Sequence, residues 1–205
     1  MAVATLPRMM ALAEKDEVHL KLVYFGPGLA GKTTNLQYVF ARTDPARRTE
    51  MRSRATETER LLWFGLTPHT LPPVFGKQVR VFLYTVPGAV FYDESRRTLL
   101  EGADGVVFVA DTQVERIEAN LESLAQLEEL LAGLGRDLTE LPFVIQYNKR
   151  DLPNRTPLAE LEHALNPRRV PQVDAVATIG RGVFETLRAC AKGAYERISE
   201  PNDGP

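Results

Sequence analysis

The chain has 205 residues, of which 44% are hydrophobic and 25% are charged, and its formal net charge is -2. A chain of this length can bury one continuous core without disulfides or a structural metal, and its single cysteine excludes a disulfide framework. The near-neutral charge argues against a strongly basic nucleic-acid-binding surface, and the hydrophobic content argues against intrinsic disorder.

The ends of the chain carry no recognisable membrane-targeting signal. The longest apolar runs are the length of strands, far below the roughly 18 residues that would span a bilayer. Ala2 stands where myristoylation requires Gly, and the last five residues lack the Cys of a prenylation motif. We therefore expect a cytoplasmic protein with no direct membrane anchor. Residues 1–17 are expected to form a flexible N-terminal extension of the domain.

Five strand-like runs rich in Val, Leu, Phe and Tyr recur along the chain, at residues 19–25, 79–86, 106–111, 143–148 and 173–176. Segments with helical periodicity occur at residues 32–41, 114–131, 158–165 and 183–198. In the last of these, Cys190 has the spacing of a buried core thiol. The alternation predicts an α/β fold in which helices cover both faces of a mostly parallel central sheet, with ligands at the carboxyl ends of the strands.

The segment at residues 43–60 has little apolar content and carries five arginines, so we expect it to be a mobile polar loop. No internal repeat or low-complexity linker divides the chain. The predicted organisation is one domain at residues 18–198 and a flexible C-terminal tail at residues 199–205.

The first strand-like run ends in a Walker A motif, G-x-x-x-x-G-K-T, and a helical segment follows it. Glycines allow backbone N–H groups to surround phosphate oxygens, and the helix N-terminus adds partial positive charge. Lys32 would neutralise β/γ-phosphate oxygens, and the Thr33 hydroxyl would ligate Mg²⁺. The residues expected to surround the phosphates are Gly26, Gly28, Leu29, Ala30, Gly31, Lys32, Thr33 and Thr34.

Walker A alone allows ATP or GTP, and a second motif decides between them. The run 143–148 ends in Asn148-Lys149-Arg150-Asp151, an N-K-x-D motif. The Asp151 carboxylate can accept hydrogen bonds from guanine N1–H and the 2-amino group, which adenine cannot offer. The alternative is that these residues merely shape a turn before Pro153. An ATP-using P-loop kinase would leave N-K-R-D unexplained.

A weaker third element follows the last strand-like run. Val176-Ala177-Thr178 occupies the place where Ras-like proteins offer a backbone N–H to guanine O6, so Val176 and Ala177 are expected to contact the base. By its composition the tripeptide is not diagnostic. Its value lies in its order and spacing after the N-K-R-D motif.

Four segments together resemble the bacterial MglA family of Ras-like polarity and motility GTPases, over about residues 18–198. They are Tyr24 to Leu36 around the phosphate loop, Phe82 to Gly88, Val106 to Asp111, and Val144 to Pro153. Thr85 is part of the similarity, since MglA proteins have Thr where most Ras-like proteins have Asp. The resemblance implies a Ras-like G domain of the P-loop NTPase class that binds GTP or GDP with Mg²⁺.

The resemblance also implies a switch and its partners. The Gly88 N–H would sense the γ-phosphate, so that hydrolysis releases a loop. Arg60 matches the family's arginine finger supplied by the same chain, and it would act in catalysis together with Lys32 and Gly88. The implied partners are a Roadblock-fold activator like MglB and effector proteins, which would recruit the chain to a cell pole in polarity or gliding motility.

Two positions depart from the family pattern. Ala89 stands where MglA proteins have the Gln that orients the attacking water, and a methyl group can neither donate nor accept a hydrogen bond. Leu61 stands where the family has a Thr that meets Mg²⁺ and the γ-phosphate, with Thr56 and Thr58 as possible substitutes. We therefore expect slow intrinsic hydrolysis. The alternative is a non-hydrolysing, GTP-bound scaffold that engages or titrates the partners of a related GTPase.

The remaining candidate residues favour structural interpretations. The histidines at positions 19, 69 and 163 have no metal-ligand spacing. Trp63 and Phe64 are expected to pack beneath the switch region rather than to stack on a base.

Overall fold

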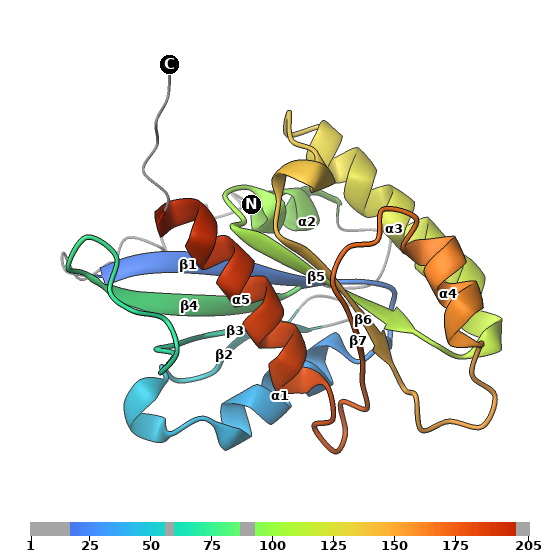
Figure 1. Ribbon diagram of the computed structural model, residues 1–205, viewed down its shortest axis with the longest axis horizontal. Coiled ribbons are helices and arrows are strands. Elements are labelled where there is room, and N and C mark those ends of the chain that lie inside the picture. The colour runs from blue at the N-terminus through green and yellow to red at the C-terminus, as the bar shows by residue number, and fades with distance from the viewer. Residues whose placement is uncertain (1–16, 56–59, 87–92, 200–205) are drawn as a thin grey trace.

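The computed structural model describes residues 17–55, 60–86 and 93–199 (Figure 1). Three of its elements are short 3-10 helices, labelled η. The elements in chain order are β1 (Glu17–Phe25), α1 (Lys32–Arg42), η2 (Pro45–Arg47), β2 (Arg52–Ala55), β3 (Arg60–Leu66), β4 (Gln78–Thr85), α2 (Asp93–Leu100), β5 (Gly105–Asp111), η3 (Val114–Arg116), α3 (Ile117–Ala132), η4 (Leu138–Glu140), β6 (Phe143–Asn148), α4 (Leu158–Leu165), β7 (Gln172–Asp174) and α5 (Val183–Ser199).

The strands form one seven-stranded sheet in the order β2-β3-β4-β1-β5-β6-β7. The pairs from β4 through β7 are all parallel, whereas β3 is antiparallel to both β4 and β2. The predicted α/β class with a mostly parallel sheet is thus confirmed. The predicted five strands correspond to β1, β4, β5, β6 and β7, and the four predicted helical segments correspond to α1, η3 with α3, α4 and α5.

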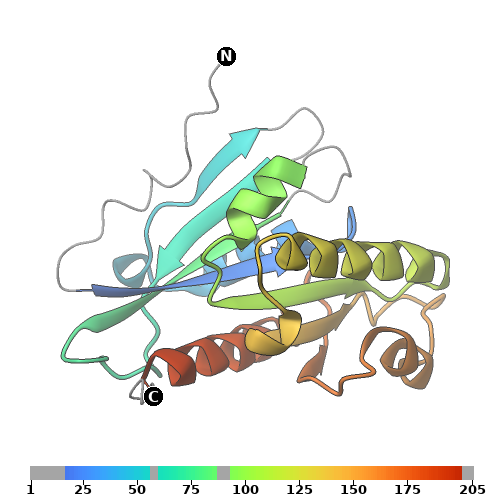
Figure 2. The same ribbon diagram turned by 90° about the horizontal axis from the view of Figure 1, so that it is seen from above.

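Helices cover both faces of the sheet, as Figure 2 shows for α5 on one side and for α2 and α3 on the other. Successive residues of β1 point to opposite faces, so Leu22 and Tyr24 join the core beneath α1 and α5, while Val23 and Phe25 join the core beneath α2, α3 and α4. Cys190 lies fully buried in the first core, where burial raises the pKa of its thiol to about 12. The prediction of a buried core thiol is therefore confirmed.

The segment predicted as a mobile loop at residues 43–60 was assigned wrongly. It contains η2, the strand β2 and the first residue of β3. The prediction failed because β2 is a polar edge strand, Arg52–Ala55, whose structure comes from pairing with β3 rather than from its own apolar pattern. The strand β3 and the helix α2 were also missed.

Trp63 and Phe64 point to opposite faces of β3. Phe64 is buried in the first core, and Trp63 is partly buried against the second. Their packing role agrees with the prediction.

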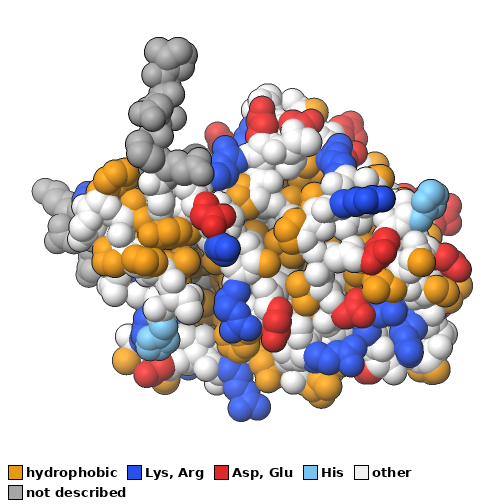
Figure 3. All heavy atoms as spheres, in the orientation of Figure 1, with side chains coloured by type: hydrophobic (Ala, Val, Ile, Leu, Met, Phe, Trp, Pro, Cys, Tyr) orange, Lys and Arg blue, Asp and Glu red, His pale blue; other side chains and the backbone are white. Residues whose placement is uncertain are grey.

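The surface in view in Figure 3 carries basic and acidic side chains interspersed with each other. Within the described ranges, no helix combines the length and apolar character needed to cross a membrane.

Because β1, β5, β6 and β7 are parallel, the loops that follow their carboxyl ends meet at one edge of the sheet, where the sequence motifs lie.

Candidate functional site

The predicted phosphate loop connects β1 to α1 at the carboxyl edge of the sheet. Gly26 has φ 136°, and a Cβ there would lie 2.3 Å from the Val109 carbonyl oxygen. Gly31 has φ 105°, and a Cβ there would lie 2.2 Å from the side-chain nitrogen of Asn148. Both positions therefore require glycine, because a side chain would break the close packing of this loop against β5 and β6.

The Lys32 ammonium group lies inside the curve of the loop. Its Nζ donates to the carbonyl oxygens of Gly26 at 2.8 Å and Pro27 at 2.6 Å, and the residue is only 6% exposed. The helix α1 begins at Lys32, so the positive end of its dipole faces the loop, and no acidic residue in its first turn offsets that charge. Thr33 is exposed in that turn, and Leu29 is exposed at the outer side of the loop. The loop thus brings the Lys32 ammonium, the N-terminus of α1 and the exposed Thr33 together at one place.

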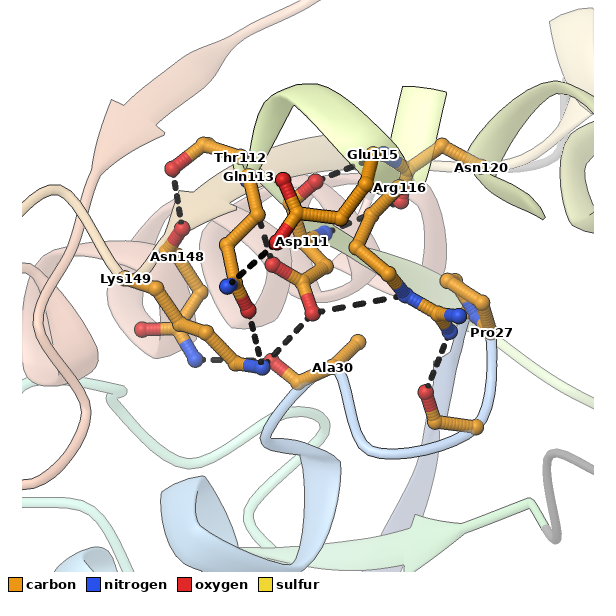
Figure 4. Close-up of polar contacts among 12 residues, drawn as sticks. Pro27, Ala30, Asp111, Thr112, Gln113, Glu115, Arg116, Asn120, Asn148 and Lys149 are labelled. Atoms are coloured by element: carbon orange, nitrogen blue, oxygen red, sulfur yellow. Dashed lines mark hydrogen bonds and ion pairs between the residues drawn. The ribbon is translucent and has the colours of Figure 1, made fainter. Parts of the chain in front are cut away.

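Asn148 joins the three predicted motifs, and Figure 4 shows its contact with Ala30 of the phosphate loop. Its Nδ2 donates to the Ala30 carbonyl at 2.8 Å, and its Oδ1 accepts from the Ala177 backbone N–H at 2.9 Å. Asn148 is 2% exposed, and Val176 and Ala177 are also buried. One buried amide therefore brings together the phosphate loop, the end of β6 and the segment after β7, as the sequence predicted for a single site.

Lys149 and Asp151 of the N-K-R-D motif lie at the rim of this site. Lys149 has φ 65°, and its Nζ donates to Asp111 Oδ2 at 2.6 Å and to Gln113 Oε1 at 3.3 Å. Asp151 is exposed in the turn that follows β6. Its carboxylate is thus accessible to a ligand that reaches this edge.

Three residues of this region, Asp111, Arg116 and Asn120, were not predicted to belong to the site. The Asp111 carboxylate is 1% exposed and faces Lys149 and Arg116, whose Nε lies 3.7 Å away. Asn120 holds the Asp111 backbone through two hydrogen bonds. Arg116 Nη2 also donates to the Gly28 carbonyl at 2.9 Å, which braces the phosphate loop from outside (Figure 4). Asp111 ends a strand-like run, but no sequence pattern indicates Arg116.

The predicted switch positions are described only in part. Gly88, Ala89, Thr56 and Thr58 lie outside the described residues, and only the backbone of Arg60 is described, as the first residue of β3.

Two neighbours of these positions are described fully. Leu61 is 6% exposed within the second core, so its side chain packs against hydrocarbon. The Thr85 hydroxyl is buried and accepts a hydrogen bond from the Leu62 backbone N–H at 2.9 Å, which ties β4 to β3. In this structure both side chains therefore serve the packing of the sheet.

The histidines occupy structural positions. His19 pairs with Glu17 and contacts the edge of the Phe82 ring, and His69 contacts Arg47. Among the described residues, no group of three or more His, Cys, Asp or Glu side chains is placed to hold a metal ion.

No model of a known protein family matches the chain. The chain is, however, 54% identical over 176 residues to the mutual gliding-motility protein MglA of Myxococcus xanthus (strain DK1622). The similarity covers 86% of this chain and 90% of that protein. Identity at this level over nearly the whole of both chains, together with the α/β fold described above, establishes that the chain belongs to the MglA family.

Proposed function

We propose that this chain is a guanine-nucleotide-dependent molecular switch that binds GTP or GDP with Mg²⁺. The observation that carries the proposal is the Asn148 side chain, whose two hydrogen bonds place the phosphate loop beside the segment after β7. A nucleotide would lie across this edge of the sheet, with its phosphates at one motif and its base at the others.

The phosphate loop supplies groups of the right chemistry for a triphosphate. Lys32 would donate to phosphate oxygens in place of the two loop carbonyls that it contacts here. Thr33 would hold Mg²⁺ together with phosphate oxygens, and the ion when bound neutralises the negative charge of those phosphates. The donor set fits this ion, because Mg²⁺ commonly uses few protein ligands. The other residues proposed to line the phosphates are Gly26, Gly28, Leu29, Ala30, Gly31 and Thr34.

The base would be recognised by the residues gathered around Asn148. Asp151 would accept from guanine N1–H and the 2-amino group, and the backbone at Val176 and Ala177 would face O6. Lys149 would cover the nucleoside from the rim, held in place by Asp111. The resulting preference for guanine depends on the pairing that adenine would lack.

Hydrolysis of GTP to GDP and phosphate is proposed to be slow without a partner. Lys32, Arg60 and the Gly88 N–H would stabilise charge that develops on the phosphates. Ala89 cannot orient the attacking water, however. The buried position of Leu61 favours the alternative function, a GTP-bound scaffold with no turnover, because this side chain offers nothing to the metal or the γ-phosphate.

The proposed setting follows from the relative, whose name describes a mutual gliding-motility protein. We propose that the nucleotide state of this chain controls cell polarity or gliding motility. A Roadblock-fold protein like MglB would act as the activator, and effector proteins would recruit the chain to a cell pole.

Guanine selectivity is tested with Asp151→Asn. The carboxylate's two acceptors become one acceptor and one donor, so GDP affinity should fall about 100-fold while xanthosine diphosphate binding improves. Competition of labelled GDP against GTP, ATP and xanthosine diphosphate measures both effects. Asp137→Asn is the matched control, because Asp137 caps η4 and Asn caps equally well. An unchanged base preference, or equal displacement by ATP in the native chain, would contradict the proposal.

The brace on the phosphate loop is tested with Arg116→Met. This change removes the donor to the Gly28 carbonyl and retains the length of the side chain, while Asp111 remains paired with Lys149. We expect GDP to dissociate about tenfold faster. The rate is measured by displacing a fluorescent GDP analogue, with the exposed Arg188→Met on α5 as control. Equal rates in the two variants would show that the brace does not contribute.

A further inference from the structure

A second buried amide lies beside Asn148 on β6. Gln146 precedes Asn148 by two residues, so both side chains point to the same face of the sheet. Gln146 Oε1 accepts from Asn35 Nδ2 at 2.7 Å. Its Nε2 donates to Asn35 Oδ1 at 2.9 Å and to Thr186 Oγ1 at 2.9 Å. The three side chains thus link β6 to α1 on one side and to α5 on the other.

Every polar atom of this network has a partner. The second N–H of Asn35 donates to the Gly31 carbonyl at 3.0 Å, and the Thr186 hydroxyl donates to the Gly182 carbonyl at 2.7 Å. All three side chains are 0% exposed. Because the Gly31 carbonyl can only accept, it fixes the orientation of the Asn35 amide, which in turn fixes that of Gln146. The network therefore admits one arrangement.

The network repeats the connection that Asn148 makes. Asn148 joins Ala30 of the phosphate loop to Ala177 after β7. Two residues earlier on β6, Gln146 connects Asn35 to Thr186 in the N-terminal part of α5. Asn35 is itself hydrogen-bonded to the phosphate loop at Gly31. Asn148 and Gln146 thus each connect the two sides of the site through hydrogen bonds, but only Asn148 belongs to the N-K-R-D motif.

An apolar pair of similar size could fill this position without hydrogen bonds, and burying polar groups is costly unless they are paired. What directional hydrogen bonds add is a fixed distance and orientation between the elements they join. We infer that Gln146, Asn35 and Thr186 are positioning residues that set the spacing between the phosphate-binding and base-binding sides, and so limit the rate of nucleotide release. The inference rests on the proposed function.

The experiment separates positioning from stability with Asn35→Leu, Gln146→Met and the double variant in the full chain. Each single change leaves a buried amide with too few partners, since Gln146 would keep only Thr186 and Asn35 only the Gly31 carbonyl. The urea midpoint of nucleotide-free protein should therefore fall, and GDP should dissociate about tenfold faster. The double variant replaces both amides with apolar side chains of similar size, so neither is left with an unmatched polar partner. We expect its urea midpoint to return toward the native value while its GDP dissociation stays about tenfold too fast.

Two further variants keep the test independent of folding defects in the double variant. Thr186→Val removes the hydroxyl at nearly constant volume and should speed dissociation, whereas Thr186→Ser keeps the hydroxyl and should retain the native rate. Asn166→Leu is the matched control. This buried amide is satisfied at the end of α4, away from the motifs, so its loss should lower the urea midpoint without changing dissociation.

Two results would overturn the inference. One is a double variant that releases GDP at the native rate, and the other is a Thr186→Val variant that does so, since either would mean that the network only packs. Failure of the proposed function is distinct, because the native chain would then retain no guanine nucleotide before any variant is compared.

Discussion

Lys32→Ala is expected to give a folded protein that no longer retains guanine nucleotide. The Lys32 ammonium is buried at the centre of the phosphate loop. Its loss removes charge-assisted hydrogen bonds to the phosphates when nucleotide is bound, and the donor to the Gly26 and Pro27 carbonyls when the site is free. Affinity for GDP should fall on the order of a thousandfold. Thr33→Ala should weaken binding through loss of the Mg²⁺ ligand.

The measurements are the nucleotide content of purified protein by ion-exchange chromatography and a calorimetric titration with GDP in Mg²⁺. Lys77→Ala, at an exposed lysine in the turn between β3 and β4, is the matched control and should purify like the native chain. Both site variants should also melt at lower temperature in GDP, because they lose the stabilisation that a bound ligand provides. Full nucleotide occupancy in both would mean that the phosphate site lies elsewhere.

Ala89→Gln is expected to raise single-turnover GTP hydrolysis from a barely measurable rate by about 10- to 100-fold. The change restores a side chain that can orient water, while Lys32, Mg²⁺ and Arg60 continue to stabilise the transition-state charge. The gain should therefore depend on Arg60. The experiment measures phosphate release for the native chain, Ala89→Gln, Arg60→Ala and the double variant, with GTP affinity determined for each.

Arg52→Ala serves as the control for Arg60→Ala, since Arg52 is an exposed arginine on the neighbouring strand β2. Fast native turnover, or an Ala89→Gln variant no faster than native, would refute slow hydrolysis through loss of the Gln. If Arg60→Ala left the Ala89→Gln rate unchanged, only the arginine-finger assignment would fall. A native chain and an Ala89→Gln variant that both hold GTP without turnover would favour the scaffold function.

Much of the fold followed from local patterns in the sequence. The parallel strands β5 and β6 are buried along their whole length, so they include apolar runs at residues 106–110 and 143–145. The helices α1 and α5 could be recognised from their periodicity. The strand β3 was missed, because its apolar run at residues 61–64 is short and its place in the sheet depends on antiparallel pairing with β4. The helix α2 has only two leucines, and it buries Arg96 as well.

The sequence by itself determined the chemistry of the candidate site, since the Walker A and N-K-R-D motifs are contiguous and their residue types have local physical requirements. Only the tertiary structure decided how these motifs are held. Arg116 reaches Gly28 across 88 residues, and Gln146 pairs with Asn35 across 111. These residues become partners only when the chain folds and places β5 and β6 beside the phosphate loop. No local pattern encodes them, because a hydrogen bond between distant residues depends on where the backbone places both.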